Sequence, residues 1–270
     1  MTTQDSRFTG SIPDVYERYM VPMIFEDYAV DLADRAAQCD ATRVLELAAG
    51  TGVVTRRLAE RCAQAVEIVA TDLNQAMLDR AVAIGTSRAV QWRTADAMRL
   101  PFGDGEFDVV VCQFGAMFFP NKAEAFCEAR RVLRLGGTLV FNVWERIELN
   151  EFPHEVSRAL AQLWPGDPPR FMERIPHGYY DPDVIRRDLR SAGFTALPEV
   201  ETVTKVSIAR APRDAAIGFC QGTPLRAEIE ARSGKTLAEA TQAAEGGLRS
   251  RFGDAQISGK IAAHVVAVQR

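Results

Sequence analysis

The chain has 270 residues, of which 47% are hydrophobic and 25% are charged, so it is long enough to bury a sizeable core. Its net charge of −4 excludes a generally basic surface of the kind that binds nucleic acid.

The cysteines and the N-terminus both point to a cytoplasmic location. The five cysteines are widely spaced and include no C-x-x-C pair, which predicts free thiols in a reducing compartment. Residues 1–10 are polar and lack the apolar stretch of a signal peptide, and no apolar run is long enough to span a membrane. We therefore expect a monomer or homodimer that binds neither nucleic acid nor membrane.

The chain begins with an aromatic-rich helical region. Residues 13–37 are predicted to form two helices separated at Pro22, because proline removes a helix hydrogen bond. This region precedes the first strand, so residues 1–40 are expected to cover the domain that follows.

Residues 41–145 alternate between apolar strands and helices. Strands are predicted at 42–48, 65–72, 89–96, 107–114 and 137–144. Helices are predicted from Gly52 to about Cys62, after Asn74, and from near Pro120 to "LRLGG", where Gly136 would take the left-handed C-terminal position. This rhythm predicts an α/β fold with a doubly wound, mostly parallel sheet.

Residues 146–270 are less regular. A helix follows Asp181, its predicted N-cap, and strands are predicted at 200–209 and 260–269, which gives seven strands in all. Helical segments near 146–180 and 211–257 are expected to cover the substrate, because ligand choice usually resides in such insertions.

The stretch "LELAAGTG" (45–52) ends the first strand and turns through small residues, where α/β sheets bind ligands. A phosphate-binding P-loop requires a Lys after the last glycine, and Val53 stands there instead. A dinucleotide fingerprint requires three glycines, but its positions are Ala48, Gly50 and Val53. The remaining interpretation is that the turn binds a nucleoside ligand without phosphates.

Two acids support the nucleoside interpretation. Asp72 ends the second strand about 20 residues after Gly50, the spacing at which a carboxylate accepts hydrogen bonds from ribose hydroxyls. Asp96 ends the third strand and offers a second polar acceptor.

Five motifs in this order resemble those of class I S-adenosylmethionine-dependent methyltransferases, specifically the methyltransferase type 11 group. They are "VLELAAGTG", "VATDLN", "TADAMRLPF", "FDVVVCQFGAMFF" and "ARRVLRLGGTLVFNVW". The resemblance implies a Rossmann-like methyltransferase fold, S-adenosylmethionine as cofactor and S-adenosylhomocysteine as product.

The resemblance also implies a role for each motif residue. The methionine part of the cofactor would be lined by Glu46, Ala48, Gly50, Thr51 and Gly52. The adenosine would be held by Asp72 at the ribose, Leu73 and Met77 beside the adenine, and Asp96 with Ala97 at its amino group. Gln113 and Phe114 would lie near the sulfonium. The chain departs from the family at Ala48, where the first loop glycine is expected, so its methyl group would crowd the cofactor.

The acceptor is expected to be a small, partly apolar molecule. No Asn/Asp-Pro-Pro-aromatic box follows the fourth strand, which argues against methylation of amino groups on bases or on protein glutamine. The segment "GAMFFP" (115–120) offers an apolar wall instead. No metal-ligand cluster is visible, so no metal is expected.

A catalytic base is the least visible part of the predicted site. His154, His177 and Tyr19 are candidates by residue type and region, and Tyr16 also lies on the first helix. His264 falls in a predicted strand and is expected to be structural.

Two alternatives stay open at this point. A nicotinamide-dependent oxidoreductase could use the same sheet, although Val53 replaces its third glycine. A catalytically inactive methyltransferase fold could serve as a binding module, since no base is identifiable.

Overall fold

The computed structural model describes residue 8 and residues 10–270, so the start of the predicted N-terminal cover, residues 1–7 and 9, lies outside the described residues. Seven strands form one sheet in the order β3-β2-β1-β4-β5-β7-β6. They are β1 (Arg43–Leu47), β2 (Glu67–Asp72), β3 (Gln91–Thr94), β4 (Phe107–Gln113), β5 (Leu133–Trp144), β6 (Glu199–Ala209) and β7 (Ile257–Gln269). Strands β1 to β5 are parallel, and β7 runs antiparallel to both of its neighbours. The predicted doubly wound, mostly parallel sheet is confirmed.

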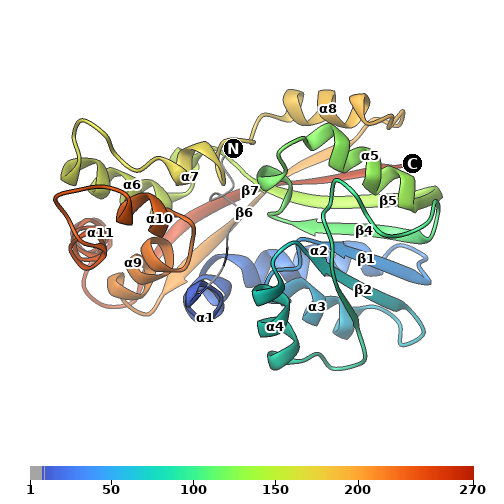
Figure 1. Ribbon diagram of the computed structural model, residues 1–270, viewed down its shortest axis with the longest axis horizontal. Helices are drawn as coiled ribbons and strands as arrows, with labels where there is room; N and C mark the ends of the chain where they lie inside the picture. Colours follow the sequence, from blue (N-terminus) through green and yellow to red (C-terminus); the bar gives the residue numbers. More distant parts are fainter. Residues whose placement is uncertain (1–7, 9) are drawn as a thin grey trace.

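Helices cover both faces of this sheet (Figure 1). On one face, α2 (Glu26–Ala37) packs beside α3 (Val53–Arg61), and α4 (Gln75–Ile84) packs on β2 and β3. On the other face, α5 (Lys122–Val132) packs beside α8 (Pro182–Ser191). Because both faces are covered, the central strands are largely apolar, and β4 is buried except for the half-buried Asp108.

A separate helical lobe lies beyond the ends of the long strands β6 and β7, at the left of Figure 1. It contains α6 (Glu151–Leu163), α7 (Phe171–Arg174), α9 (Pro212–Gln221), α10 (Leu225–Glu230) and α11 (Leu237–Phe252). Helix α11 packs on both α6 and α9, so segments nearly 100 residues apart in sequence form one bundle. Two short 3-10 turns, η2 (Ala116–Phe118) and η3 (Ile147–Leu149), complete the described elements.

The predicted break at Pro22 is wrong. The chain stays helical from α1 (Ile12–Val15) through a π-helical segment, η1 (Tyr16–Phe25), into α2, and Pro22 lies inside η1. A π-helix bonds each N–H to the carbonyl five residues back, as the Glu26 N–H does with Val21. The wider turn leaves room for the proline ring, and the missing N–H interrupts one bond without ending the helix.

The predicted helix end at "LRLGG" is also wrong. Helix α5 ends at Val132, and β5 begins at the next residue. Gly136 does have a left-handed backbone, with φ of +77°, but it lies within β5. The pairing of β5 with β4 shifts between Phe107 and Val109, so the glycine permits an irregularity in the strand, not a helix cap.

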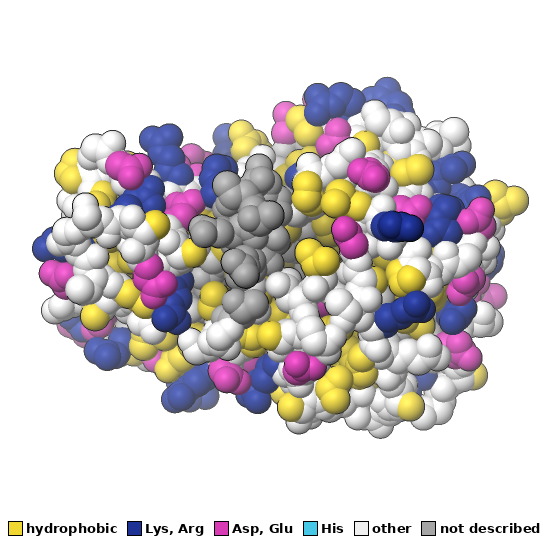
Figure 2. Space-filling view, viewed as in Figure 1, with side chains coloured by type: hydrophobic (Ala, Val, Ile, Leu, Met, Phe, Trp, Pro, Cys, Tyr) yellow, Lys and Arg dark blue, Asp and Glu magenta, His cyan; other side chains and the backbone are white. Residues whose placement is uncertain are grey.

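Acidic and basic side chains are interspersed on the face of the molecule shown in Figure 2, which agrees with the absence of a single-sign charge excess in the composition. None of the helices in the described part of the chain has both the length and the apolar character needed to cross a bilayer.

Candidate functional site

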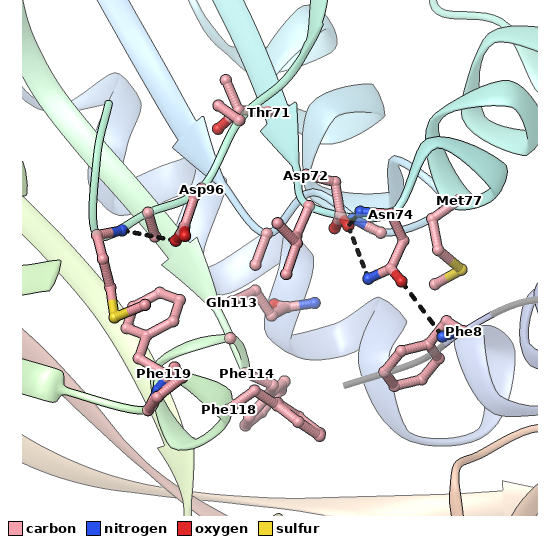
Figure 3. Close-up of a pocket in the computed structure, with 18 of the residues that line it drawn as sticks. Phe8, Thr71, Asp72, Asn74, Met77, Asp96, Gln113, Phe114, Phe118 and Phe119 are labelled. Atoms are coloured by element: carbon pink, nitrogen blue, oxygen red, sulfur yellow. Dashed lines mark hydrogen bonds between the residues drawn. The ribbon is translucent and has the colours of Figure 1, made fainter. Parts of the chain in front are cut away.

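A cavity of about 470 Å³ opens at the carboxyl ends of β1, β2, β3 and β4 (Figure 3). This is the edge at which open α/β sheets bind ligands, because the strand-to-helix turns converge there. Its walls come from these turns and from two residues of the N-terminal region. The lining residues are Phe8, Tyr16, Ala48, Gly50, Thr71, Asp72, Leu73, Asn74, Met77, Ala95, Asp96, Ala97, Met98, Gln113, Phe114, Gly115, Phe118, Phe119 and Pro120.

Nine of the twelve residues predicted to bind the cofactor line this cavity. They are Ala48, Gly50, Asp72, Leu73, Met77, Asp96, Ala97, Gln113 and Phe114. The other three, Glu46, Thr51 and Gly52, lie in β1 or its turn and are outside the lining set. The structure therefore brings the predicted residues to one place, although they come from four separate strand ends.

The turn after β1 is built from left-handed residues. Gly50 and Gly52 have φ values of +57° and +82°, which glycine adopts without strain. A side chain at Gly52 would come within 2.9 Å of Trp92, so this glycine lets α3 start close to its neighbours. At Gly50 the nearest atom to such a side chain is the Met77 methyl group at 3.5 Å, so Gly50 leaves room on the cavity side.

Ala48 also has a left-handed backbone, with φ of +52°, which costs a non-glycine residue about 1 kcal/mol. Its methyl group is accommodated by Gly115, since a side chain there would approach the Ala48 Cβ to 2.5 Å. At the position where the motif is expected to have a glycine, this chain therefore has Ala48 with a left-handed backbone. Gly115 on the facing loop leaves space for the Ala48 methyl group.

Asp72 is buried at the end of β2, and its carboxylate is fixed by two backbone amides. Gly50 N–H donates to Oδ2 over 2.8 Å and Asn74 N–H donates to Oδ1 over 2.7 Å. Burial raises the pKa of Asp72, while these hydrogen bonds oppose the shift. A carboxylate oxygen accepts more than one hydrogen bond, so both oxygens remain able to receive ribose hydroxyls from the cavity side.

Glu46 lies deeper, below the turn, and only 1% of it is exposed. The Thr55 hydroxyl donates to Glu46 Oε2 over 2.5 Å. Burial raises the pKa of Glu46 to about 8, so this carboxyl is largely protonated at neutral pH. Nearby, the Thr51 hydroxyl is buried without a hydrogen-bond partner in the described chain. A charged amino group entering beside Glu46 would favour its ionised form.

The opposite end of the cavity combines apolar surface with a second acid. Leu73 is 56% exposed, which is unusual for a leucine beside a buried strand and leaves apolar area for a flat ligand to cover. Asp96 accepts a hydrogen bond from Met98 N–H over 2.9 Å, which orients its carboxylate after β3. Figure 3 shows Asp72 and Asp96 on neighbouring strand ends.

Phe114, after β4, has a left-handed backbone with φ of +47°, which is costly for an aromatic residue. Asn142 holds it there, because Phe114 N–H donates to Asn142 Oδ1 over 2.9 Å. The Phe114 ring stacks on Trp144, with centroids 3.6 Å apart and planes 6° from parallel. The two stacked rings therefore form a rigid aromatic surface at the wall of the cavity.

The three predicted base candidates are not among the described residues that line the cavity. His154 lies on α6, and Tyr19 lies on η1 below the guanidinium of Arg18. His177 is buried, with Nδ1 2.8 Å from the Glu145 carbonyl oxygen, and burial lowers its pKa to about 4. His264 lies in β7, where its Nδ1 is 3.0 Å from the Thr202 hydroxyl.

Tyr16 does line the cavity, one helical turn before Tyr19. Its hydroxyl makes no hydrogen bond with any described residue, and burial raises its pKa, so it is a proton donor and not a base at neutral pH.

Sequence reasoning missed Phe8 and Asn74 as lining residues, whereas Phe118, Phe119 and Pro120 belong to the segment 115–120 that was predicted to offer an apolar wall. Asn74 was interpreted as a helix cap, and it does occupy the N-cap of α4. The phenylalanines of "GAMFFP" carried an apolar signal but no indication of which ring faces the cavity. No sequence pattern indicated that Phe8 lines the cavity. Its position depends on a long-range hydrogen bond that Phe8 N–H donates to Asn74 Oδ1 over 3.4 Å.

Comparison with known proteins agrees with this geometry. A family model described as a methyltransferase domain matches residues 45–141. A ubiquinone/menaquinone biosynthesis C-methyltransferase from Dinoroseobacter shibae is 38% identical over 136 residues, which are 48% of this chain and 50% of that protein. A demethylmenaquinone methyltransferase from Deinococcus radiodurans is 39% identical over 124 residues, 45% of this chain and 48% of that one. The chain thus spans about half the length of the curated relatives it matches.

Solved structures share the fold at low sequence identity. The YcgJ protein from Bacillus subtilis superposes with a TM-score of 0.57 at 17% identity, over 90% of this chain and 99% of that chain. A phosphoethanolamine N-methyltransferase 2 from Haemonchus contortus, in complex with S-adenosyl-L-methionine, gives 0.60 at 16% identity, over 100% of this chain and 60% of that chain. The sequence match thus identifies residues 45–141 as similar to a methyltransferase domain, and the solved structures show the same fold, in agreement with the resemblance carried by the motifs.

Proposed function

We propose that the chain transfers a methyl group from S-adenosylmethionine to a small, partly apolar acceptor. The observation that carries this proposal is the convergence of nine motif residues on one cavity, whose described lining residues include two oriented carboxylates and no lysine. The cavity thus suits a nucleoside joined to an amino acid.

Different residues at the site are assigned to different parts of the cofactor. Asp72 holds the ribose hydroxyls, Leu73 and Met77 cover the adenine, and Asp96 with Ala97 takes the adenine amino group. Glu46, Ala48 and the Gly50–Gly52 turn face the methionine part, and Gln113 and Phe114 lie near the sulfonium. When bound, the cofactor supplies an electrophilic methyl group.

The protein's own contribution is to exclude water and to hold the acceptor in line with that methyl group. The apolar rings of Phe114, Phe118 and Phe119 remove water from this side of the cavity. None of the described lining residues is a histidine, so the acceptor atom does not depend on a histidine base. We infer that the acceptor presents a nucleophile that is already reactive.

The relatives support a small-molecule acceptor. One is named a ubiquinone/menaquinone biosynthesis C-methyltransferase and another a demethylmenaquinone methyltransferase. Their similarity covers about half of this chain, so the same cofactor chemistry is proposed for it, while the class of acceptor is inferred from the cavity walls.

The test is calorimetric titration with S-adenosylhomocysteine. Wild type is expected to bind it, and Asp72→Ala is expected to weaken binding by about 100-fold, because two hydrogen bonds to a charged group are lost. Asp79→Ala serves as the matched control, since Asp79 is exposed on α4 and outside the cavity lining. Undetectable binding to wild type, or equal binding to Asp72→Ala, contradicts the proposal.

Two further assays address the alternatives. Tight binding of NADH would favour the oxidoreductase, which Val53 disfavours because its side chain stands where the dinucleotide fingerprint needs a glycine for close packing of the helix on the strand. Binding of the cofactor with no turnover on a metabolite panel would favour a binding module without catalysis.

A further inference from the structure

A second, smaller cavity adjoins the cofactor cavity. The two cavities share Phe8, Tyr16, Phe114 and Phe118 as lining residues, so the same side chains form the boundary between them. The smaller one measures about 50 Å³, several times the roughly 10–15 Å³ that a single water molecule needs. It therefore has room for one edge of a larger molecule.

Aromatic rings dominate the walls of this aromatic pocket. They come from the N-terminal cover, from β4 and β5, and from the helical lobe: Tyr16, Phe25, Phe114, Phe118, Trp144 and Phe171. The remaining side chains include Thr223, whose hydroxyl already donates to the Phe219 carbonyl over 2.7 Å and accepts from Leu225 N–H over 3.2 Å. The Thr223 hydroxyl is thus occupied by the protein itself.

None of the described residues lining the aromatic pocket is charged. A primary ammonium of the acceptor would lose its water without gaining a carboxylate partner, and attraction to ring faces, about 2 kcal/mol, is smaller than a desolvation penalty of several kcal/mol. An acceptor carboxylate or phosphate would equally lack a Lys or Arg. The pocket therefore selects against charge at the part of the acceptor that enters it.

The walls are also flat and fixed. The parallel stack of Phe114 on Trp144 is locked by the hydrogen bond from Phe114 N–H to Asn142. Phe25 contacts both rings of this stack, with centroids 5.6 Å and 5.9 Å away. Rigid ring faces favour an occupant that is itself planar, since offset and edge contacts between rings add to the burial of apolar area.

We propose that the aromatic pocket receives the acceptor, and that the acceptor is a planar ring compound uncharged at the end that enters. This inference rests on the proposed function and specifies its substrate class. The ring edge lies in the aromatic pocket, and the atom to be methylated faces the shared boundary of Tyr16, Phe114 and Phe118.

The first test uses three probes of one shape, 2-naphthol, 2-naphthoate and 2-naphthylmethylammonium, titrated at pH 7 into protein saturated with S-adenosylhomocysteine. We expect 2-naphthol to bind at least 10-fold more tightly than either charged probe. Tighter binding of the ammonium would overturn the proposal in favour of a cation site. Failure of all three, with S-adenosylhomocysteine bound, overturns the acceptor pocket and leaves the proposed function standing.

The second test uses Phe171→Leu, which removes a ring of the aromatic pocket from α7, at a residue that is not itself among the described lining residues of the cofactor cavity. Affinity for 2-naphthol is expected to fall about 5-fold, while affinity for S-adenosylhomocysteine stays within 2-fold of wild type. Phe252→Leu is the matched control, because Phe252 packs on Phe152 in the helical lobe, away from both cavities. Unchanged 2-naphthol binding in Phe171→Leu contradicts the proposal.

Discussion

The cofactor core and the helical lobe build their parts of the site in different ways. In the core, the residues that line the cavity directly follow β1, β2, β3 and β4, so their position is set by the sheet. In the lobe, Phe171 of α7 and Thr223, which lies between α9 and α10, reach the aromatic pocket only through long-range packing. The core therefore specifies one ligand by strand order, whereas the lobe can change its ligand without altering the sheet.

The two regions also differ in polarity. The cofactor cavity contains the carboxylates of Asp72 and Asp96, each oriented by backbone N–H groups. The aromatic pocket has no charged residue among its described walls. A ligand with fixed hydroxyl and amino groups suits the first, and an apolar acceptor suits the second. Variants that affect one region and spare the other test this division.

Among variants at Glu46, Lys122 and Ala48, the Glu46 variant gives the largest expected effect. Glu46→Gln should weaken S-adenosylhomocysteine binding about 10-fold, because the neutral amide cannot pair with the ligand's amino group. Since burial raises the apo pKa of Glu46 to about 8, we expect wild type to release about one proton on binding at pH 7. Calorimetry in buffers of different ionisation enthalpy measures this release, which should vanish in Glu46→Gln.

The raised pKa of Glu46 also has a consequence for stability. The folded protein binds a proton that the unfolded chain has lost, so this group makes folding weaker as pH rises from about 4.5 to about 8. In Glu46→Gln this contribution should disappear, and the melting temperature should fall less steeply over that range. An equally steep fall in both proteins would contradict the buried, protonated state.

Substitution of Lys122 should weaken ligand binding in both the cofactor cavity and the aromatic pocket. Its Nζ donates to the carbonyls of Met117 and Phe119 at 3.2 Å and 3.0 Å and lies 4.8 Å from the Tyr179 ring centre. It thereby ties the loop that carries Phe118, a wall of both cavities, to the segment before α8. In Lys122→Met, binding of S-adenosylhomocysteine and of 2-naphthol should each weaken about 3-fold to 5-fold.

The control for Lys122 is Lys235→Met, which removes an exposed lysine paired with Glu239 one turn away. This variant should leave both affinities unchanged. If Lys122→Met weakens only one ligand, the loop does not serve as a common wall.

Ala48→Gly gives the smallest expected effect. Glycine adopts the left-handed backbone of residue 48 without strain, although it also gives the unfolded chain more freedom. We expect unfolding free energy to change by less than about 1 kcal/mol and S-adenosylhomocysteine to bind about 2-fold to 5-fold more tightly, because a methyl group leaves the cavity wall. Weaker binding would show that the alanine methyl contributes a favourable contact.

The sequence was sufficient for the core because strand ends can be located from apolar runs and turn residues. Asp72 and Asp96 were predictable for that reason, and they line the same cavity. Where helix geometry departs from the ideal, prediction failed: Pro22 lies inside a π-helical segment, and Gly136 lies inside a strand. The 3.6-residue period also could not decide between Tyr16 and Tyr19, of which Tyr16 faces the cavity.

The division of labour between the two regions is tested most directly by titrating S-adenosylhomocysteine into Asp72→Ala and Phe171→Leu side by side. We predict that Asp72→Ala loses about 100-fold in affinity, because a buried carboxylate acceptor of the ribose is gone, while Phe171→Leu binds like wild type. Equal losses in both variants, or wild-type affinity in Asp72→Ala, would contradict a cofactor site that is built without the helical lobe.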